Sequence, residues 1–311
     1  MRRIKAHAIL PAMLSQVRYA RLPTEQSHPR TRALERFTPE QLAGLMASEE
    51  RRVARAVQTQ RRAIGRAIRL ITDILSRGGR LWFVGAGTSG RLGVLEAAEC
   101  PPTFGTPPAL VQAIIAGGRA AVFRSREGAE DDRAAARRIV RARVRRGDAV
   151  VGIAASGVTP FVAEAVRDAR RQGARTIFIT CHPRAPRLAE VTIALSVGPE
   201  VLTGSTRLKA GSATKLVLNC LTLGAMVRLG KTHGHLMVDV RPTSRKLRAR
   251  ALRIIRTFTG GSEPQAARAL LAARGRTKVA ILMARRGLTY RQAAQRLTVV
   301  HGSLQRALTG R

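Results

Sequence analysis

Acidic residues, aromatic residues, lysine and asparagine are all scarce in this chain of 311 residues. Its 19 Asp and Glu stand against 56 Lys and Arg, so the formal net charge is +37. Aromatic residues make up only 3%, and none is interleaved with the arginine runs to form a platform for base stacking. The positive charge therefore favours anionic partners in general, and nucleic acid only as a non-specific partner, if at all.

Arginine carries almost all of the basic charge. Only six of the basic residues are Lys, and Asn219 is the single asparagine. A chain that avoids both residues while filling with Arg and Ala is typical of drift toward GC-rich codons, not of selection for one basic patch. Residues 201–311 nevertheless hold 22 basic residues and two acids, so the last third is the most basic part of the chain.

Cysteines and long apolar runs are also few. Three cysteines without a C-x-x-C spacing argue against a disulfide framework or a zinc cluster and favour a reducing compartment, so we expect a cytoplasmic protein with no metal. The longest uncharged run of helical type, residues 216–227, falls short of the roughly 20 residues that cross a bilayer, so no membrane partner is expected. Residues 1–21 match a signal peptide poorly. They are expected to be a loose basic extension, or to contain an over-assigned start with Met13 as the real one.

The chain does contain enough apolar residues, 45%, to build a substantial core. Short apolar runs of strand type alternate with helical stretches, which predicts a doubly wound, mostly parallel five-stranded α/β sheet with flanking helices. The expected strands are residues 80–84, 110–115, 149–154, 174–181 and 191–197. Residues 39–76 are expected to form one or two long helices with Thr38 as N-cap, and residues 130–146 another helix. We expect a main domain over residues 22–246 and a small all-helical domain over 247–311.

Two loops after predicted strands carry Gly, Ser and Thr. Gly85-x-Gly87-x-x-Gly90 has the spacing of a dinucleotide fingerprint, but residues 101–119 lack the acidic residue that would hold a ribose. Its Thr88 and Ser89, at the start of a helix, suit a single phosphate instead. Residues 156–159 form a second such loop, with Ser156 and Thr159. Either loop alone is equally compatible with a capped helix start; together they favour a sugar phosphate.

Two carboxylates are candidates for acid–base chemistry. Glu99 precedes Pro101-Pro102, which we expect to end a helix and stiffen the backbone, and Glu130 lies in the acidic segment 127–132. That segment is also explained, and better on the residues alone, as the acidic first turn of a helix. Cys100 is expected to be a buried thiol and not a nucleophile, and the pair His233 and His235 to be loop residues and not metal ligands.

Several long motifs nevertheless occur in a recognisable order. They are FVGAGTSGRLGVLEAAECPPTFG, EGAEDD, GIAASGVTPFV, GPEVLTGSTRLKAG, KLVLNCLTLGAMVRLGK and HLMVDV. From about Leu22 to the C-terminus the chain closely resembles the N-acetylmuramic acid 6-phosphate etherases of the sugar isomerase (SIS) superfamily. This resemblance implies an SIS-type sheet and a carbon–oxygen lyase that acts in amino-sugar catabolism and peptidoglycan recycling without a cofactor. It also implies a homodimer.

The resemblance assigns roles to particular residues. Glu99 corresponds to the family's proton donor, and Glu130 to the other catalytic residue, which we assign as the base at carbon 2 of the sugar. The residues expected to hold the 6-phosphate are Thr88, Ser89, Ser156 and Thr159, and those expected to line the site are Ser205, Thr206 and Lys209. His stands where the family usually has Asn at His28, His182 and His235, so contacts to an N-acetyl group could be weakened.

Two other classes of function remain open. A non-catalytic sugar-phosphate-binding regulator would need both loops but neither glutamate. A nucleic-acid-associated protein would use the basic last third of the chain, where residues 289–308 could be taken for a helix-turn-helix. The presence of both Glu99 and Glu130 favours the enzyme.

Overall fold

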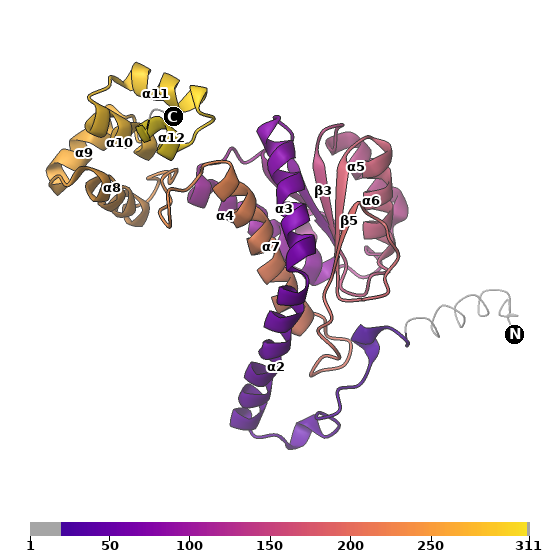
Figure 1. Ribbon diagram of the computed structural model, residues 1–311. Coiled ribbons are helices and arrows are strands. Elements are labelled where there is room, and N and C mark those ends of the chain that lie inside the picture. Colours follow the sequence, from indigo (N-terminus) through magenta and orange to yellow (C-terminus); the bar gives the residue numbers. More distant parts are fainter. Residues whose placement is uncertain (1–19, 310–311) are drawn as a thin grey trace, which may run out of the picture. The chain divides into compact units, whose positions relative to one another are not determined.

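The computed structural model describes residues 20–309, so most of the expected N-terminal extension lies outside the described residues. Figure 1 shows a sheet flanked by helices and a set of helices toward the C-terminus. The strands are β1 (Leu81–Gly85), β2 (Val111–Ile115), β3 (Ala149–Ile153), β4 (Arg175–Thr180) and β5 (Val191–Ala194). The α-helices are α2 (Pro39–Thr59), α3 (Arg61–Ser76), α4 (Gly87–Phe104), α5 (Arg133–Arg143), α6 (Pro160–Arg171), α7 (Lys209–Arg228), α8 (Arg245–Thr259), α9 (Glu263–Ala272), α10 (Thr277–Arg286), α11 (Tyr290–Val299) and α12 (Leu304–Thr309). Short 3-10 helices are η2 (Pro23–Glu25), η3 (Leu34–Arg36) and η4 (Arg119–Val122).

The five strands form one parallel sheet in the order β2-β1-β3-β4-β5, which confirms the predicted fold class. Ala149 of β3 pairs with Arg175 of β4, and Ile177 of β4 pairs with Val191 of β5. All five expected strands are present, with ends that differ from the prediction by at most three residues. The central strands β1 and β3 are buried along their whole length, as a sheet covered on both faces requires.

The chain divides into two compact units. The first unit comprises residues up to 67, Trp82–Val94 and Ala113–Leu218, and the second comprises Ile68–Leu81, Leu95–Gln112 and the residues from Asn219 onward.

In the first unit, helices cover both faces of the sheet. Trp82 and Val84 alternate with Phe83 along β1, so their side chains lie on the opposite face from Phe83. Trp82 and Val84 belong to a buried cluster built largely from α5 and α6. Phe83 instead contacts α4, where a Cβ added to Gly93 would lie 2.8 Å from the Phe83 Cβ. Gly93 therefore permits α4 to approach the sheet closely.

Two predicted helix boundaries are wrong. Pro101 and Pro102 do not end the helix that carries Glu99, because α4 continues to Phe104 and the Gly105 amide donates to the Pro101 carbonyl over 2.9 Å. Gly105 then has a φ of +63°, the left-handed conformation that closes helices. The helix predicted from residue 130 begins only at Arg133, because Asp132 is its N-cap and accepts from the Ala135 amide over 2.8 Å.

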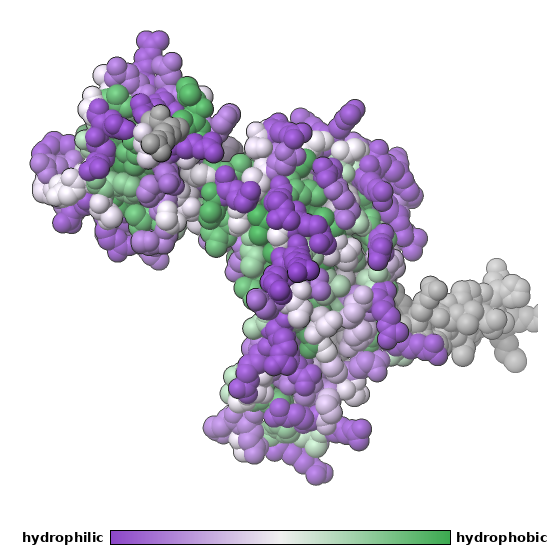
Figure 2. Space-filling view, viewed as in Figure 1, coloured by the Kyte–Doolittle hydropathy of each residue, from purple (hydrophilic) through white to green (hydrophobic). Residues whose placement is uncertain are grey.

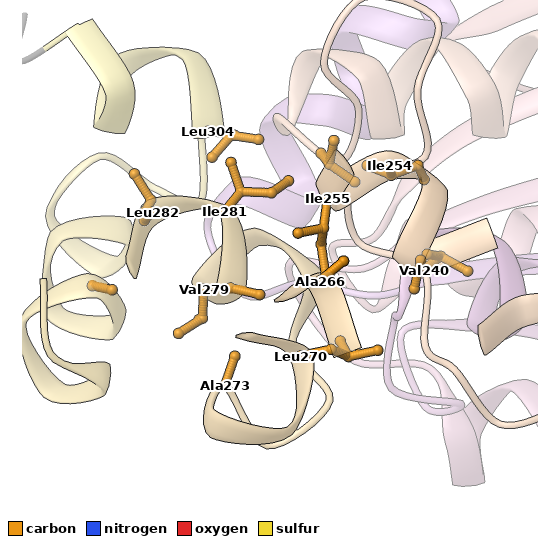
Figure 3. Close-up of a cluster of buried hydrophobic side chains, with 14 of the residues drawn as sticks. Val240, Ile254, Ile255, Ala266, Leu270, Ala273, Val279, Ile281, Leu282 and Leu304 are labelled. Carbon is orange, nitrogen blue, oxygen red and sulfur yellow. The ribbon is translucent and has the colours of Figure 1, made fainter. Parts of the chain in front are cut away.

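The second unit contains the C-terminal helices α8 to α12. Their buried side chains converge on one core, in which Ile255, Leu270 and Ile281 come from three different helices (Figure 3). Ser244, Ser262 and Thr289 accept backbone hydrogen bonds at the starts of α8, α9 and α11. Capping and a shared core explain why these short helices are stable. No strand occurs after β5 within residues 20–309, as predicted for the chain's last part.

Helix α7 is the one described helix long and apolar enough, by length and composition alone, to cross a membrane. A helix of this length was not predicted from the sequence, because only the uncharged run 216–227 was considered. The helix begins earlier, at Lys209, and includes Lys215. More than half of its apolar window is buried within the protein, as in the core helix of a folded domain.

Candidate functional site

The order of the strands places a topological switch point at the carboxyl ends of β1 and β3. The chain passes from β1 to β2 on one side of the sheet and then to β3 on the other, so the connections diverge between these two neighbouring strands. Open parallel sheets bind ligands outside such a point. Both predicted loops follow these two strands and belong to the first unit, so the fold brings them to the same edge of the sheet.

The first loop is built around close backbone contacts that only glycine permits. A Cβ on Gly85 would lie 2.6 Å from the Gly90 nitrogen, and a Cβ on Gly90 would lie 2.6 Å from the Ile115 side chain. Helix α4 starts at Gly87, so Thr88 and Ser89 lie in its first turn and are half-exposed. The first-turn amides and these two hydroxyls together provide hydrogen-bond donors for an anion.

The second loop leads into α6. Gly157 has a φ of +80°, and a Cβ there would lie 2.9 Å from Ala185, so the turn needs glycine. Ser156 accepts from the Val158 amide over 3.3 Å. Thr159 is the N-cap of α6, yet its side chain makes no capping hydrogen bond. Helix capping therefore does not account for the Thr159 hydroxyl, which leaves a ligand role open to it.

The start of α7 lies beside the first loop. A Cβ on Gly211 would lie 3.5 Å from the Thr206 carbonyl oxygen and 3.9 Å from Cγ2 of Thr88. Ser205 and Thr206, both half-exposed, form the turn that precedes α7. The structure thus brings the predicted lining segment close to the first loop.

Lys209 is placed differently from its neighbours in that segment. Its side chain is 1% exposed and its Nζ donates to Oε2 of Glu49 over 2.6 Å. The same Oε2 lies 3.3 Å from both Nε2 of His28 and Nε of Arg52. Burial alone would raise the pKa of Glu49, but hydrogen bonding and the charge of Lys209 outweigh it and lower that pKa. The ammonium group of Lys209 is therefore already engaged in the interior.

Glu200 holds the backbone at the start of α7. Its carboxylate accepts from the Lys209 and Ala210 amides at 3.0 and 2.9 Å. Burial raises the pKa of Glu200 despite these two hydrogen bonds. The Glu200 carboxylate at this helix start explains how the Lys209 backbone is fixed. The sequence pattern did not indicate this role for Glu200.

Glu130 is tied to the second loop through the main chain. The Phe161 amide, in the first turn of α6, donates to the Glu130 carbonyl over 2.9 Å. Desolvation raises the pKa of Glu130, and the like charges of Asp131 and Glu127 raise it further. A carboxyl whose pKa is raised toward neutrality is a better proton-transfer group near pH 7.

A small cavity of about 100 Å³ joins Glu130 to the first loop. Its lining includes Gly87 of that loop, Glu130, Glu127 and Arg91. Nε of Arg91 donates to the Val122 carbonyl over 2.9 Å, which fixes the guanidinium beside the cavity. Sequence reasoning missed Arg91. Its position one residue after the loop's last glycine was the only available signal, and the 49 other arginines obscured it.

Glu99 belongs to the second unit and is exposed on α4. One turn earlier, Glu96 is buried and accepts from the Thr222 hydroxyl of α7 over 2.5 Å. This hydrogen bond fixes α4 against α7 next to the turn that carries Glu99.

One cysteine and two histidines considered in the sequence analysis, Cys100, His233 and His182, are packed against other parts of the chain. Cys100 is buried, as predicted, and burial together with Glu96 and Glu99 raises its pKa to about 12. His233 packs edge-on against Phe258 with ring centroids 5.0 Å apart. His182 lies against the second loop, and its Nδ1 is buried without a hydrogen-bond partner among residues 20–309. Burial lowers the pKa of His182, and the charge of Arg184 adds to that effect.

Comparison with known proteins gives two domain matches. Residues 63–170 match the glucokinase regulatory protein N-terminal SIS domain, and residues 131–224 match the SIS domain. Among curated proteins, the N-acetylmuramic acid 6-phosphate etherase of Synechocystis sp. is 48% identical over 290 residues, covering 92% of this chain and 95% of the relative. That of Gloeobacter violaceus is 54% identical over 268 residues, covering 85% and 87%. The chain belongs to the N-acetylmuramic acid 6-phosphate etherase family.

The resemblance seen in the sequence motifs is thus confirmed. Among solved structures, a putative phosphosugar isomerase from Bacteroides fragilis is 21% identical, with a TM-score of 0.45, over 60% of this chain and 91% of that one. In this member of the etherase family the two loops and both glutamates are present, and the loops lie at the edge of the sheet where a ligand is expected.

Proposed function

We propose that the chain cleaves the D-lactyl ether of N-acetylmuramic acid 6-phosphate and releases N-acetylglucosamine 6-phosphate and D-lactate. The observation that carries this proposal is 46–54% identity to curated etherases over 84–94% of the chain. The match to the SIS domain of glucokinase regulatory protein does not extend as far, since it covers only residues 63–170.

The chemistry requires two proton-transfer groups and no redox step. In the open-chain sugar, the proton on carbon 2 is acidic because it lies next to the aldehyde. Glu130 removes this proton, the electron pair forms a double bond between carbons 2 and 3, and the bond from carbon 3 to the lactyl oxygen breaks. Glu99 protonates the departing oxygen, which leaves as D-lactate.

Water then adds to the unsaturated aldehyde with the roles reversed. The carboxylate of Glu99 takes a proton from water as its oxygen bonds to carbon 3, and Glu130 returns a proton to carbon 2. One water is consumed and both carboxyl groups recover their starting states. The raised pKa of Glu130 supports this assignment, because a base that must also act as an acid needs a pKa near the working pH.

The 6-phosphate is held by the two loops. Thr88, Ser89, Ser156 and Thr159 supply hydroxyl donors at two helix starts on one edge of the sheet. Ser205 and Thr206 line the site from the turn before α7. Lys209 was expected to line it as well; its buried pairing with Glu49 supports an indirect role in holding this turn.

A homodimer with the site near its interface fits an unusual surface in the second unit. Leu95 of α4 and Leu223 and Val227 of α7 are 43–52% exposed although they are large and apolar. Figure 2 shows hydrophobic residues gathered over this part of α4 and α7. A second copy covering these side chains would remove them from water. The place of action is the cytoplasm, in the recycling of peptidoglycan.

Incubation of the purified chain with N-acetylmuramic acid 6-phosphate, followed by enzymatic detection of D-lactate, tests the activity. The proposal predicts stoichiometric D-lactate and N-acetylglucosamine 6-phosphate. A folded chain that binds the substrate and releases no lactate would support the alternative, a sugar-phosphate-binding regulator, and would reject the etherase.

A further inference from the structure

The second unit contains a larger cavity that the proposed reaction does not use. It has a volume of about 570 Å³, within the range of small-molecule sites. Its walls come from the end of α4, the segment between α7 and α8, and the turn between α9 and α10. Neither phosphate loop nor either catalytic glutamate lines it.

The cavity is strongly cationic. Its charged lining residues are Lys231, Asp239, Arg241, Arg274, Arg276 and Lys278. The two lysines are already engaged, because Oδ2 of Asp239 lies 3.0 Å from Nζ of Lys231 and 2.7 Å from Nζ of Lys278. Lys278 also donates to the Gly230 and Gly302 carbonyls at 2.8 and 2.7 Å. The excess positive charge therefore belongs to the three arginines.

The side chain of Tyr290 contacts two of these arginines, Arg274 and Arg276. The guanidinium of Arg274 lies over the Tyr290 ring at 4.7 Å from its centroid, and Nη1 of Arg276 donates to the Tyr290 hydroxyl over 3.4 Å. Arg241 is exposed at the cavity wall. Within residues 20–309, no carboxylate lies at ion-pair distance from any of these three guanidinium groups.

The start of α10 adds backbone donors to the same cavity. The first helical hydrogen bond runs from the Ala280 amide to the Arg276 carbonyl over 3.0 Å, so the amides of Thr277, Lys278 and Val279 have no partner within the helix. All three residues line the cavity, and the N-cap residue Arg276 supplies no side-chain acceptor. Positive side chains at the positive end of a helix dipole are unfavourable unless an anion is bound there.

The walls of the cavity are held firmly. A Cβ on Gly105 would lie 2.5 Å from the Asp239 carbonyl oxygen, so the end of α4 packs directly on this segment. The Thr277 hydroxyl, which is buried, donates to the Val240 carbonyl over 3.2 Å and joins α10 to it. The first-turn amides of α10 therefore do not have to be assembled by the ligand.

We propose that this cavity binds the phosphate or diphosphate group of a phosphorylated small molecule, with Arg241, Arg274, Arg276 and the first-turn amides of α10 as donors. Guanidinium groups and helix-start amides are both suited to phosphate oxygens. The site is separate from the loops that take the sugar 6-phosphate in the proposed reaction.

Hydrogen–deuterium exchange of the full chain, measured by mass spectrometry with inorganic pyrophosphate as the probe, tests this site at constant ionic strength. A pyrophosphate concentration of about ten times the dissociation constant should slow exchange of the Thr277–Val279 amides by about tenfold, because exchange then requires release of the anion. Peptides from the phosphate loops are resolved separately, so binding there does not confuse the result.

Two double variants with the same change of net charge complete the test. R241Q/R276Q removes two of the proposed donors, whereas R253Q/R268Q removes two exposed arginines of α8 and α9 that do not line the cavity. Protection should vanish in the first variant and persist in the second. Absence of protection in the natural chain, or an equal loss in both folded variants, would show that pyrophosphate senses only the general positive field and would overturn the site.

Discussion

The edge of the sheet in the first unit and the cavity in the second unit both offer donors to an anion, but by different means. At the sheet edge the donors are hydroxyls and helix-start amides, and carboxylates such as Glu130 stand close by. In the second unit the proposed donors are three arginines without carboxylate partners in the described chain, together with the first-turn amides of α10. Neutral donors can hold a phosphate without fixing the charge of a nearby base, which acid–base chemistry requires. The net charge of +37 therefore does not locate the chemistry.

The largest expected effect is the loss of activity in Glu130→Gln. Removing a proton-transfer group lowers the rate by about 10²- to 10⁴-fold. Glu127→Gln is the matched control, because Glu127 lines the same cavity but has no assigned proton to move. D-lactate release should fall steeply in the first variant and by less than about tenfold in the second. Equal losses would mean that the acidic segment acts only through its charge.

Two ion-paired lysines, Lys209 and Lys231, provide a comparison of stability between the units. Lys209→Met removes the 2.6 Å ion pair of the buried Glu49 and leaves that carboxylate with only His28 and Arg52 at 3.3 Å, which costs up to about 3–5 kcal/mol. Lys231→Met costs less, because Asp239 keeps its 2.7 Å ion pair with Lys278. Urea unfolding of both variants measures the difference, and a Lys209→Met variant as stable as Lys231→Met would contradict the structural role of the buried pair.

The hydroxyls of the phosphate loops should affect substrate binding. A hydrogen bond to a charged phosphate contributes about 1.5–3 kcal/mol, so Ser89→Ala should raise KM by roughly 10- to 150-fold. Ser48→Ala is a control in the same unit, because its hydroxyl donates to the Leu45 carbonyl of its own helix. An unchanged KM in Ser89→Ala would remove Ser89 from the phosphate site.

The smallest effect is a shift in the pH profile. Because partial desolvation and its acidic neighbours raise the pKa of the exposed Glu130, activity should be lost on acidification at a higher pH than for an ordinary Glu. Asp131→Asn removes one like charge, lowers that pKa, and should move the acid limb of kcat/KM to lower pH. Asp132→Asn, which preserves a capping side chain, should leave the limb in place. Identical profiles would exclude Glu130 as the titrating base.

Local sequence patterns predicted the helices and strands, but they did not predict contacts between residues that are far apart in the sequence. Short apolar runs gave all five strands, and Thr38 caps α2 as expected, in a capping box with Gln41. The end of α4 was missed because two prolines can occupy a last helical turn when a glycine follows to close it. The burial of Lys209 depends on Glu49, 160 positions away, and no local pattern records such a pairing.

In the candidate site, too, local sequence indicated some features, while others depended on the fold. The loop sequences predicted Thr88, Ser89, Ser156 and Thr159 as phosphate-binding residues, because glycine and hydroxyl residues that follow a strand form a local pattern, and their role stays a prediction. The tie between the Glu130 backbone and α6, and the place of Arg91, follow from the order of the strands and became visible only with the fold.

Incorporation of solvent deuterium at carbon 2 of the sugar product tests the central claim most directly. When the reaction is run in deuterium oxide, the account predicts deuterium at carbon 2 from the natural chain, with turnover and incorporation both abolished in Glu130→Gln. N-acetylglucosamine 6-phosphate without deuterium at carbon 2, or full turnover in Glu130→Gln, would contradict the elimination chemistry and the assignment of Glu130 as its base.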